Sequence, residues 1–322
     1  MKEKILFIIN PVSGIGKQKT VEQAIETHLD KKKYNYNIAY TQYPHHATTI
    51  SKEAVQEGYS IVVAVGGDGS INDCVRGLIN TKIKLGIIPA GSGNGLARCL
   101  HIPLEVTKAI EVINLNNNLR IDTINLNDRP YASVAGVGFD ALIAKEFTGS
   151  KIRGFQTYLK LVLKDYLNYK PKKYTLIVDG IEIEREALFI SFMNSNQFGY
   201  NAIIAPKASL NDGLLDVVVV KKPPIILAPF VVQMMFFHKM DKSPYVETFR
   251  AKEVEVKNFE DGILNLDGEG IEYKEKSLKF CVEPNDLNVI VPDKKNKQPF
   301  LSEKKILDLI KSIIYELPKK EE

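Results

Sequence analysis

The sequence predicts an α/β domain with a parallel sheet, followed by an antiparallel β domain. Two observations predict this order. In the first third, short apolar runs alternate with helical patterns and lead into Gly-rich turns, which is typical of parallel strands buried on both faces. From about Leu119 onward, strand follows strand, with apolar and polar residues alternating. The length of 322 residues fits about two domains.

The first domain is predicted to cover residues 1–118. Its predicted strands are Ile5–Ile9, Tyr36–Tyr40, Ile61–Val65 and Leu85–Ile88, and its predicted helices are Thr20–Lys31, Thr48–Glu57 and Ile71–Ile79. Ligands of parallel sheets bind beyond the carboxyl ends of the strands. We therefore expect the functional residues of this domain in the loops that follow its strands.

The second domain is predicted to cover residues 119–291. Its predicted strands are Tyr174–Val178, Ile181–Glu186, Leu188–Met193, Leu214–Val220, Glu253–Val256, Gly262–Leu266, Leu278–Val282 and Leu287–Val291. The turn Asp179-Gly180 predicts a hairpin between the first two. Residues 292–322 are predicted to pack back on the first domain through a helix at Ser302–Glu316. A helix that lies on a membrane is the alternative.

Composition and charge argue against several classes of protein. A net charge of +4 falls short of the strongly basic footprint of a nucleic-acid binder. Three cysteines without a CxxC pair indicate neither a disulfide framework nor a zinc site, which favours a reducing cytoplasm. The longest apolar stretch, Pro223 to Phe237, is shorter than the roughly 18–20 residues that span a bilayer. We expect a cytoplasmic protein that is soluble or peripherally bound to a membrane.

Three loops rich in glycine or small polar residues follow predicted strands. They are Asn10-Pro11-Val12-Ser13-Gly14, Gly66-Gly67-Asp68-Gly69-Ser70-Ile71-Asn72 and Pro89-Ala90-Gly91-Ser92-Gly93-Asn94. Glycine lets the backbone approach an anion closely, and successive N–H groups together with a following helix N-terminus attract negative charge. The loops therefore predict a phosphate site at one edge of the sheet. They match neither a P-loop nor a dinucleotide-binding fingerprint.

These motifs together resemble the diacylglycerol kinase catalytic-domain family, which includes bacterial diacylglycerol kinases, phosphatidylglycerol-type lipid kinases, sphingosine kinases and ceramide kinases. The second domain adds Ala205-Pro206-x-Ala208-Ser209-x-x-Asp212-Gly213-x-Leu215-Asp216-Val217 and Leu266-Asp267-Gly268-Glu269. The resemblance implies an α/β nucleotide-binding domain of the NAD kinase and diacylglycerol kinase type, a C-terminal antiparallel β-sandwich domain, and ATP in the cleft between them.

The resemblance also implies which residues contact the nucleotide. They are Asn10, Pro11, Val12, Ser13, Gly14, Thr41, Gly66, Gly67, Asp68, Gly69, Ser70, Asn72 and Ser92. A simple turn or helix cap is the alternative for each of them. By the same resemblance, Ser209, Asp212 and Leu214 match a site at which relatives bind a structural Mg²⁺, with a plain Asp-Gly turn as the alternative.

Three acids are candidates for catalysis. Asp68 lies in a predicted phosphate-binding loop, where a carboxylate would repel ATP unless a metal or a proton intervened, so we favour catalytic over structural use. Asp267 and Glu269 are two residues apart and would face the same side of an extended strand. The resemblance implies that Glu269 accepts the proton of a lipid hydroxyl, with Asp267 assisting. Some sphingosine-kinase relatives give that role to the acid equivalent to Asp68.

The stretch 145–173 is the predicted contact with a membrane. It carries eight Lys or Arg residues against two acids, interleaved with five aromatic residues, which suits a helix on an anionic bilayer surface. A solvated helix face is the alternative. Apolar residues in this stretch are expected to line an acyl-chain groove, with Ile225–Phe237 as a second wall, although ordinary core packing explains both. The first group is Leu159, Leu161, Val162, Leu163 and Leu167.

These observations predict an ATP- and Mg²⁺-dependent kinase that phosphorylates a hydroxyl of a membrane lipid, with diacylglycerol as the favoured acceptor. Ser92-Gly93-Asn94-Gly95 and Asn72-Asp73 depart from the bacterial diacylglycerol kinase pattern, so a sphingoid base, ceramide or phosphatidylglycerol stays open. The alternatives of another class are a soluble-metabolite kinase like NAD kinase and a regulator without catalysis. We expect no nucleic-acid partner, and the sequence leaves a homodimer open.

Overall fold

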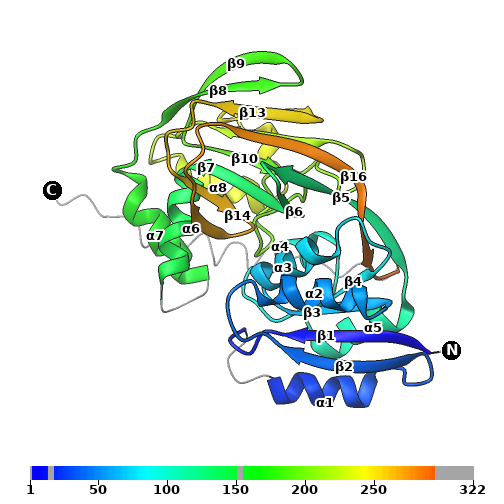
Figure 1. Ribbon diagram of the computed structural model, residues 1–322. Coiled ribbons are helices and arrows are strands. Elements are labelled where there is room, and N and C mark those ends of the chain that lie inside the picture. Colours follow the sequence, from blue (N-terminus) through cyan, green and yellow to red (C-terminus); the bar gives the residue numbers. More distant parts are fainter. Residues whose placement is uncertain (1, 14–17, 151–154, 294–322) are drawn as a thin grey trace. The chain divides into compact units, whose positions relative to one another are not determined.

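The computed structural model describes residues 2–13, 18–150 and 155–293, which form two compact units (Figure 1). Of the described residues, unit 1 comprises those up to 133 together with 209–213 and 282–293. Unit 2 comprises 134–208 and 214–281. The predicted C-terminal helix at 302–316 lies outside the described residues.

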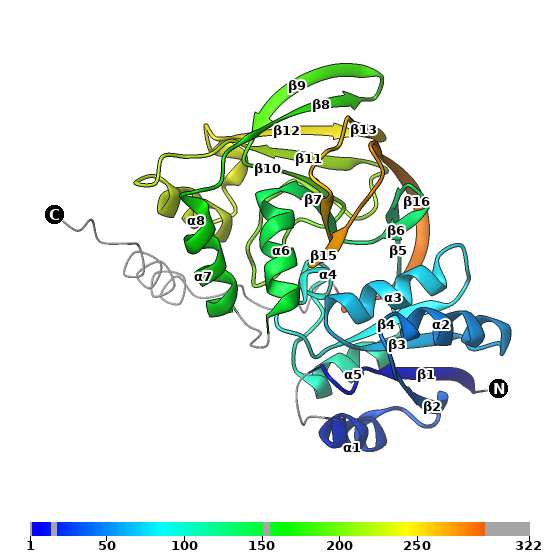
Figure 2. The ribbon, with the colours of Figure 1, turned by 60° about the vertical axis from the view of Figure 1, so that its left-hand side comes forward.

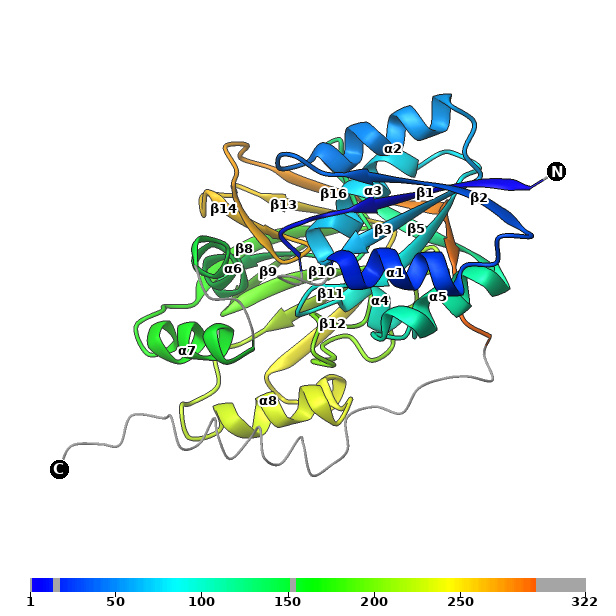
Figure 3. The ribbon, with the colours of Figure 1, turned by 90° about the horizontal axis from the view of Figure 1, so that it is seen from below.

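Unit 1 is built on a parallel sheet in the order β2-β1-β3-β4-β16. Its strands are β1 (Glu3–Ile9), β2 (Tyr34–Tyr40), β3 (Ile61–Gly66), β4 (Lys84–Pro89) and the end of β16 (Leu278–Ile290). Helices α1 (Gln18–His28) and α5 (Val106–Leu115) lie on one face, and α2 (His46–Gln56) and α3 (Asp68–Leu78) lie on the other (Figure 3). Strands covered on both faces explain the unbroken apolar runs of the sequence.

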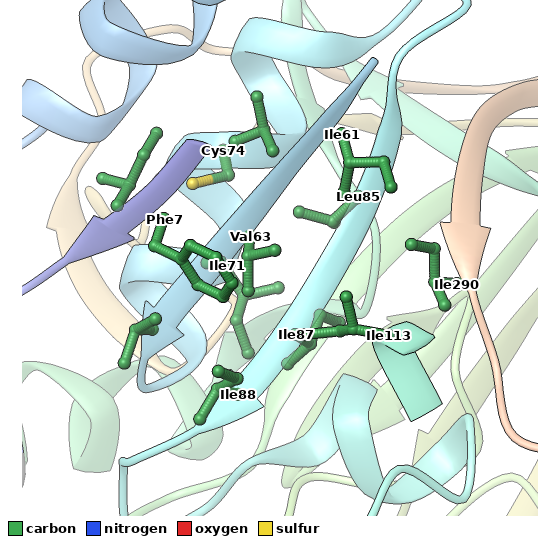
Figure 4. Close-up of a cluster of buried hydrophobic side chains, with 14 of the residues drawn as sticks. Phe7, Ile61, Val63, Ile71, Cys74, Leu85, Ile87, Ile88, Ile113 and Ile290 are labelled. Carbon is green, nitrogen blue, oxygen red and sulfur yellow. The ribbon is translucent and has the colours of Figure 1, made fainter. Parts of the chain in front are cut away.

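The core of unit 1 lies between the sheet and these helices. Every residue of β3 is buried, and Figure 4 shows Val63 of that strand among Phe7, Ile71 and Ile87 from the neighbouring elements. Each fully buried aliphatic or aromatic side chain of this kind contributes about 1.5–3 kcal/mol. The strands that lead into the glycine-rich loops are therefore firmly packed.

Unit 2 contains an antiparallel sheet in the order β12-β11-β10-β7-β14-β15. Its strands are β7 (Val134–Gly138), β10 (Phe189–Met193), β11 (Leu215–Val220), β12 (Val246–Ala251), β14 (Ile263–Leu266) and β15 (Glu269–Glu272). A second layer is formed by β8 (Lys172–Val178), β9 (Ile181–Ala187), β13 (Glu253–Lys257) and the first residues of β16. Phe192 of β10 stacks on Phe280 of β16 at 3.8 Å between ring centroids, so the two layers share a core. The predicted α/β domain and antiparallel β sandwich are confirmed.

The remaining helices of unit 2 are α6 (Phe139–Gly149), α7 (Phe155–Tyr166) and α8 (Ala228–Phe236) (Figure 2). A short 3-10 turn covers Met240–Lys242. Stretch 145–173 is thus not one helix: it includes the end of α6, then α7, and the start of β8. Among the described residues, no helix has the length and hydropathy needed to cross a bilayer.

Two boundaries differ from those that the sequence predicts. The units divide at 133/134 instead of 118/119, because β5 (Asn118–Leu126) and β6 (Arg129–Tyr131) lie with unit 1. The two strands predicted at 278–282 and 287–291 are one strand, β16. The polar residues between them read as a break, but β5 holds them: Asp122 Oδ1 accepts a hydrogen bond from Asn285 N (2.8 Å), and Thr123 Oγ1 donates one to Asp286 Oδ2 (2.7 Å).

The remaining helix of unit 1 is α4 (Gly95–Cys99), a short helix that follows the loop after β4. It belongs to the candidate site.

Candidate active site

The three glycine-rich loops of unit 1 meet beyond the carboxyl ends of β1, β3 and β4. Backbone hydrogen bonds continue past the strands: Asn10 N donates to Val65 O at 3.1 Å, and Ala90 N donates to Gly66 O at 2.8 Å. The loops therefore leave the sheet side by side, as the sequence predicts for a parallel sheet. Thr41 lies next to them, because its N–H donates to Ile9 O at 3.0 Å at the end of β2.

Two of the loops touch at a pair of glycines. A Cβ built on Gly91 would lie 2.5 Å from the Gly67 Cα, and one built on Gly67 would lie 3.2 Å from the Gly91 Cα. Cβ atoms do not approach backbone to 2.5 Å, so only glycine at position 91 lets the loops pack this closely. The result is a surface of bare backbone beside the N-terminus of α3, which is the kind of surface that binds a phosphate chain.

Asn10 joins the first loop to the start of α3. Its Nδ2 donates to Ser70 Oγ at 3.0 Å, and its Oδ1 accepts from Val12 N at 3.0 Å, which shapes the turn after β1. Asn72, two residues after Ser70 in α3, is buried, and its Oδ1 accepts no hydrogen bond within the described residues. Such an oxygen is a candidate acceptor for a ligand.

The other predicted nucleotide residues lie in the same loops. Pro11, Val12 and Ser13 follow β1, with the Val12 side chain 80% exposed, and Ser92 is exposed beyond β4. Gly69 lies in the first turn of α3. Gly14 falls outside the described residues.

Asp68 has a structural role that the sequence argument ranked second. Its Oδ2 accepts from Asn94 N at 2.8 Å and its Oδ1 from Gly95 N at 2.6 Å, so the carboxylate caps α4. Burial raises the pKa of Asp68, and the two N–H donors oppose that effect. The Asn94 side chain in turn exchanges two hydrogen bonds with the backbone of Gly91. Asp68 therefore ties the loop after β4 to the loop after β3.

Asp68→Ala is expected to lower the free energy of unfolding by about 2 kcal/mol, because two partly buried N–H groups lose their acceptor. Asp68→Asn keeps one acceptor oxygen and is expected to lose about half as much. Urea unfolding followed by circular dichroism measures both. Wild-type stability in Asp68→Ala would contradict the capping role.

Arg98 is a residue of this site that the sequence reasoning did not name. Its Nε donates to Gly93 O at 2.9 Å, and its positive charge favours the ionised form of Asp68. It lies in α4, one helical turn after Asn94. The sequence signal that could have indicated Arg98 is a cationic residue four positions after Asn94, at the end of a glycine-rich loop.

The turn Asp267-Gly268 in unit 2 differs from the sequence expectation. Both residues have positive φ values, 49° and 87°, and Leu266 pairs with Glu269 across a two-residue hairpin. Asp-Gly favours this turn because both positions require left-handed backbone. Asp267 and Glu269 are therefore not consecutive positions on one face of an extended strand, and that argument was wrong.

The two acids have different environments. Asp267 is buried and its Oδ1 accepts from Val134 N at 2.7 Å, while Asp267 N donates to Val134 O at 2.8 Å. Glu269 begins β15 and is partly exposed. Of the two, Glu269 has the more accessible carboxylate. A catalytic role for Asp267 or Glu269 would require these residues of unit 2 to act on a phosphate bound to unit 1. That role stays a prediction.

The predicted metal residues also belong to different units, with Ser209 and Asp212 in unit 1 and Leu214 in unit 2. Asp122 holds the loop that carries the first two: its N–H donates to Leu210 O at 2.6 Å, and its Oδ2 accepts from Gly213 N at 2.7 Å. In the part of the chain that the structure describes, no three His, Cys, Asp or Glu side chains gather as a metal cluster. A carboxylate with hydroxyl and backbone oxygens is nevertheless a donor set that suits Mg²⁺.

Comparison with known proteins assigns both units. A sequence model described as the diacylglycerol kinase catalytic domain matches residues 4–126, and one described as the YegS C-terminal NAD kinase beta sandwich-like domain matches residues 133–291. The chain belongs to the diacylglycerol kinase catalytic-domain family. The predicted resemblance is confirmed, and so is its class of enzyme, a lipid kinase. Membership in a kinase family implies the use of ATP.

Individual proteins are similar to the chain over most of its length. The chain is 28% identical to a diacylglycerol kinase of Staphylococcus carnosus over 84% of its own length and 89% of that protein. It is also 28% identical to a diacylglycerol kinase of Staphylococcus aureus, over 84% and 87% of the two chains. A crystal structure of a diacylglycerol kinase from Bacillus anthracis has the same fold, with a TM-score of 0.71 at 20% identity over 90% of this chain and 97% of that one.

Proposed function

We propose that this member of the family transfers the γ-phosphoryl group of ATP to the free hydroxyl of diacylglycerol, with Mg²⁺, at a membrane surface. The observation that carries the proposal is the contact between Gly67 and Gly91 in unit 1, which presents bare backbone from two loops beside the N-terminus of α3. Positioning and neutralisation of oxygen charge account for most of the rate of phosphoryl transfer, and this surface is suited to both.

In the proposed complex the phosphates lie against the Gly66–Ser70 loop, and the side-chain amide N–H groups of Asn10 and Asn72 are the proposed donors to phosphate oxygens. Mg²⁺, when bound, would neutralise charge on the phosphate oxygens. Ser209, Asp212 and Leu214 are the proposed ligands of a second, structural Mg²⁺. Both carboxylate oxygens of Asp68 accept hydrogen bonds from backbone N–H groups. The proposed role of Asp68 is therefore to hold the loops after β3 and β4 together.

Glu269 is the proposed general base. Its carboxylate accepts the proton of the lipid hydroxyl while that oxygen forms a bond to the γ-phosphorus, and the bond from the γ-phosphorus to the bridging oxygen of ADP breaks. Asp267 is bound to the backbone of Val134 and is proposed to hold the turn that presents Glu269.

Diacylglycerol is the proposed acceptor because the relatives from Staphylococcus that match over most of their length carry that name. Incubation of the chain with labelled ATP and a panel of diacylglycerol, sphingosine, ceramide, phosphatidylglycerol and NAD tests this choice. Label transfer to diacylglycerol alone is the expected result, and transfer to NAD without transfer to any lipid would refute the lipid assignment.

The proposed membrane contact lies on unit 2. Among the described residues of 145–173, three lysines are ion-paired: Lys145 with Glu272, Lys164 with Glu146, and Lys172 with Asp261. The stretch therefore offers less free charge to a bilayer than its composition indicates. Leu159 is buried, and Leu161 and Val162 pack against a core cluster, so these residues support core packing and not an acyl-chain groove.

Exposed apolar residues instead lie just after α7, in the segment that leads into α8, and in the first turn of α8. These are Leu167, Ile225, Ile226, Leu227 and Phe230, and we call them the apolar rim. Ile226 and Phe230 are 76% and 62% exposed. Lys222 connects the two segments, since its Nζ donates to Leu167 O and Tyr169 O. Exposed apolar side chains beside lysine suit a bilayer interface.

Phe230→Asp is expected to weaken binding to vesicles of phosphatidylglycerol and phosphatidylcholine by about 10- to 100-fold, from the roughly 1.5–3 kcal/mol that burial of one such side chain contributes. Sedimentation with sucrose-loaded vesicles measures the change. Ile181→Asp is the matched control, because Ile181 is 68% exposed on β9, outside the apolar rim. Equal losses in the two variants would argue against the apolar rim as the contact.

A further inference from the structure

A buried hydrogen-bond network lies behind the turn that carries Asp267 and Glu269. Asp140 is in the first turn of α6 and is 5% exposed, and Asn265 of β14 is 4% exposed. Asn265 Nδ2 lies 3.0 Å from both carboxylate oxygens of Asp140. Asn265 Oδ1 accepts from Gly268 N at 3.0 Å. The carboxylate therefore orients the amide, and the amide holds the backbone of the residue between the two acids.

Glycines let α6 approach the sheet closely enough to form this network. A Cβ on Gly136 of β7 would lie 1.9 Å from Asp140 Oδ2, and a Cβ on Gly270 of β15 would lie 2.1 Å from Lys145 N. Further along α6, Thr148 Oγ1 accepts from Gly270 N at 3.2 Å. One helix thus contacts the hairpin on both sides of the turn, which fixes the start of β15.

The buried carboxylate of Asp140 lowers the stability of the fold when it is ionised. Burial raises the pKa of Asp140 to about 6, so the ionised group costs stability at neutral pH. Well-packed apolar residues would stabilise a hairpin without that cost. What they would not do is fix which way the Asn265 amide points, and only one of its two orientations offers an oxygen to Gly268 N.

We infer that Asp140, acting through Asn265, is a positioning residue that fixes the Gly268 amide and thereby the directions of Asp267 and Glu269. The inference rests on the proposed role of Glu269 as the base. Asp140 itself touches neither nucleotide nor lipid in this proposal. Its effect is on the rate of transfer, with the affinity for ATP unchanged.

Exchange of the two side chains tests the inference. Asn265→Asp sets two carboxylates face to face, because it removes the NH2 group that donates to Asp140. The repulsion is expected to displace the side chain that accepts from Gly268 N and to lower kcat by roughly 10- to 100-fold, with KM for ATP unchanged. Asp140→Asn combined with Asn265→Asp restores the polarity in reverse: Asn at 140 donates to Asp at 265, whose other oxygen accepts from Gly268 N. The double variant is expected to regain at least about tenfold in kcat over Asn265→Asp.

The pH dependence of Asn265→Asp provides a second readout. One proton shared between its two carboxylates recreates a donor, so its kcat relative to wild type is expected to rise as pH falls toward 5. Tyr158 of α7 also faces Asp140, and because burial raises its pKa it stays neutral in this range. The double variant does not carry the facing pair, so its kcat relative to wild type is expected to lack this rise.

The outcomes separate this inference from the proposed function. If Glu269→Gln is inactive while folded Asn265→Asp keeps the kcat and pH profile of wild type, the positioning role is wrong and the base stands. If folded Glu269→Gln keeps full activity, the base assignment fails first. A double variant that is folded by circular dichroism but no faster than Asn265→Asp would also overturn the inference. Where Asn265→Asp does not fold, Asp140→Asn replaces it, with a loss of about three- to tenfold in kcat expected from one weakened hydrogen bond.

Discussion

Glu269→Gln is expected to lower the rate of phosphoryl transfer to diacylglycerol by about 10²- to 10⁴-fold, which is the usual contribution of a general base. The amide has the size of the carboxylate but cannot accept the proton of the lipid hydroxyl. Glu269 is partly exposed and pairs with Leu266 through its backbone, so the substitution leaves the hairpin intact. Initial rates with radiolabelled ATP and dispersed diacylglycerol measure the effect.

Glu272→Gln is the matched control for this prediction. Glu272 lies on the same short strand, is exposed, and forms an ion pair with Lys145 at 2.9 Å. Loss of an exposed ion pair costs at most about 1 kcal/mol, so this variant is expected to keep nearly full activity. Comparable rates in the two variants would show that Glu269 is an ordinary surface acid.

Gly91→Ala is expected to have the largest effect on unit 1. The new Cβ would lie 2.5 Å from the Gly67 Cα, which is backbone and cannot swing away. The loops after β3 and β4 would have to separate, at a cost of about 1–3 kcal/mol in the free energy of unfolding. A misplaced backbone donor would also weaken ATP binding by about tenfold or more, since a hydrogen bond to a charged group contributes roughly 1.5–3 kcal/mol. Calorimetry with ATP and Mg²⁺, together with urea unfolding, measures both losses.

Gly67→Ala and Gly149→Ala are the comparison variants for Gly91→Ala, with a smaller effect and no effect expected. The Cβ of Gly67→Ala would lie 3.2 Å from the Gly91 Cα, which a small shift accommodates, and the Cβ of Gly149→Ala in α6 meets no atom within 4 Å. We expect ATP affinity to fall in the order Gly149, Gly67, Gly91, from no change to the largest loss. An ATP affinity in Gly91→Ala equal to that of wild type would show that the two loops do not hold the phosphates together.

Much of the fold could be predicted because each unit has a clear pattern in its residues. The run Ile61–Val65 is apolar throughout because β3 is covered on both faces, and the Asp179-Gly180 turn joins β8 to β9 as its left-handed preference predicts. Where the pattern was interrupted, prediction failed. The polar residues near Asn285 looked like a loop, yet Asp122 and Thr123 from a distant strand satisfy them inside β16.

The candidate site shows the same division. Residue types alone placed the glycine loops at the ends of parallel strands, since parallel strands all end at one edge. They also indicated the family through motifs in both units. Residue types did not reveal that Asp68 caps α4, because its partners are backbone N–H groups 26 and 27 residues away.

The amino-acid sequence by itself therefore determined the order of the elements, the parallel and antiparallel character of the two units and the glycine-rich loops at one edge of the parallel sheet, because these depend on local periodicity and backbone freedom. The tertiary structure decided which carboxylates are exposed and which are already bound. Asp68 and Asp140 are the same residue type, so the sequence does not distinguish them. Their hydrogen-bond partners come from segments far along the chain. Only folding brings those segments together, and only then does an acid acquire its role.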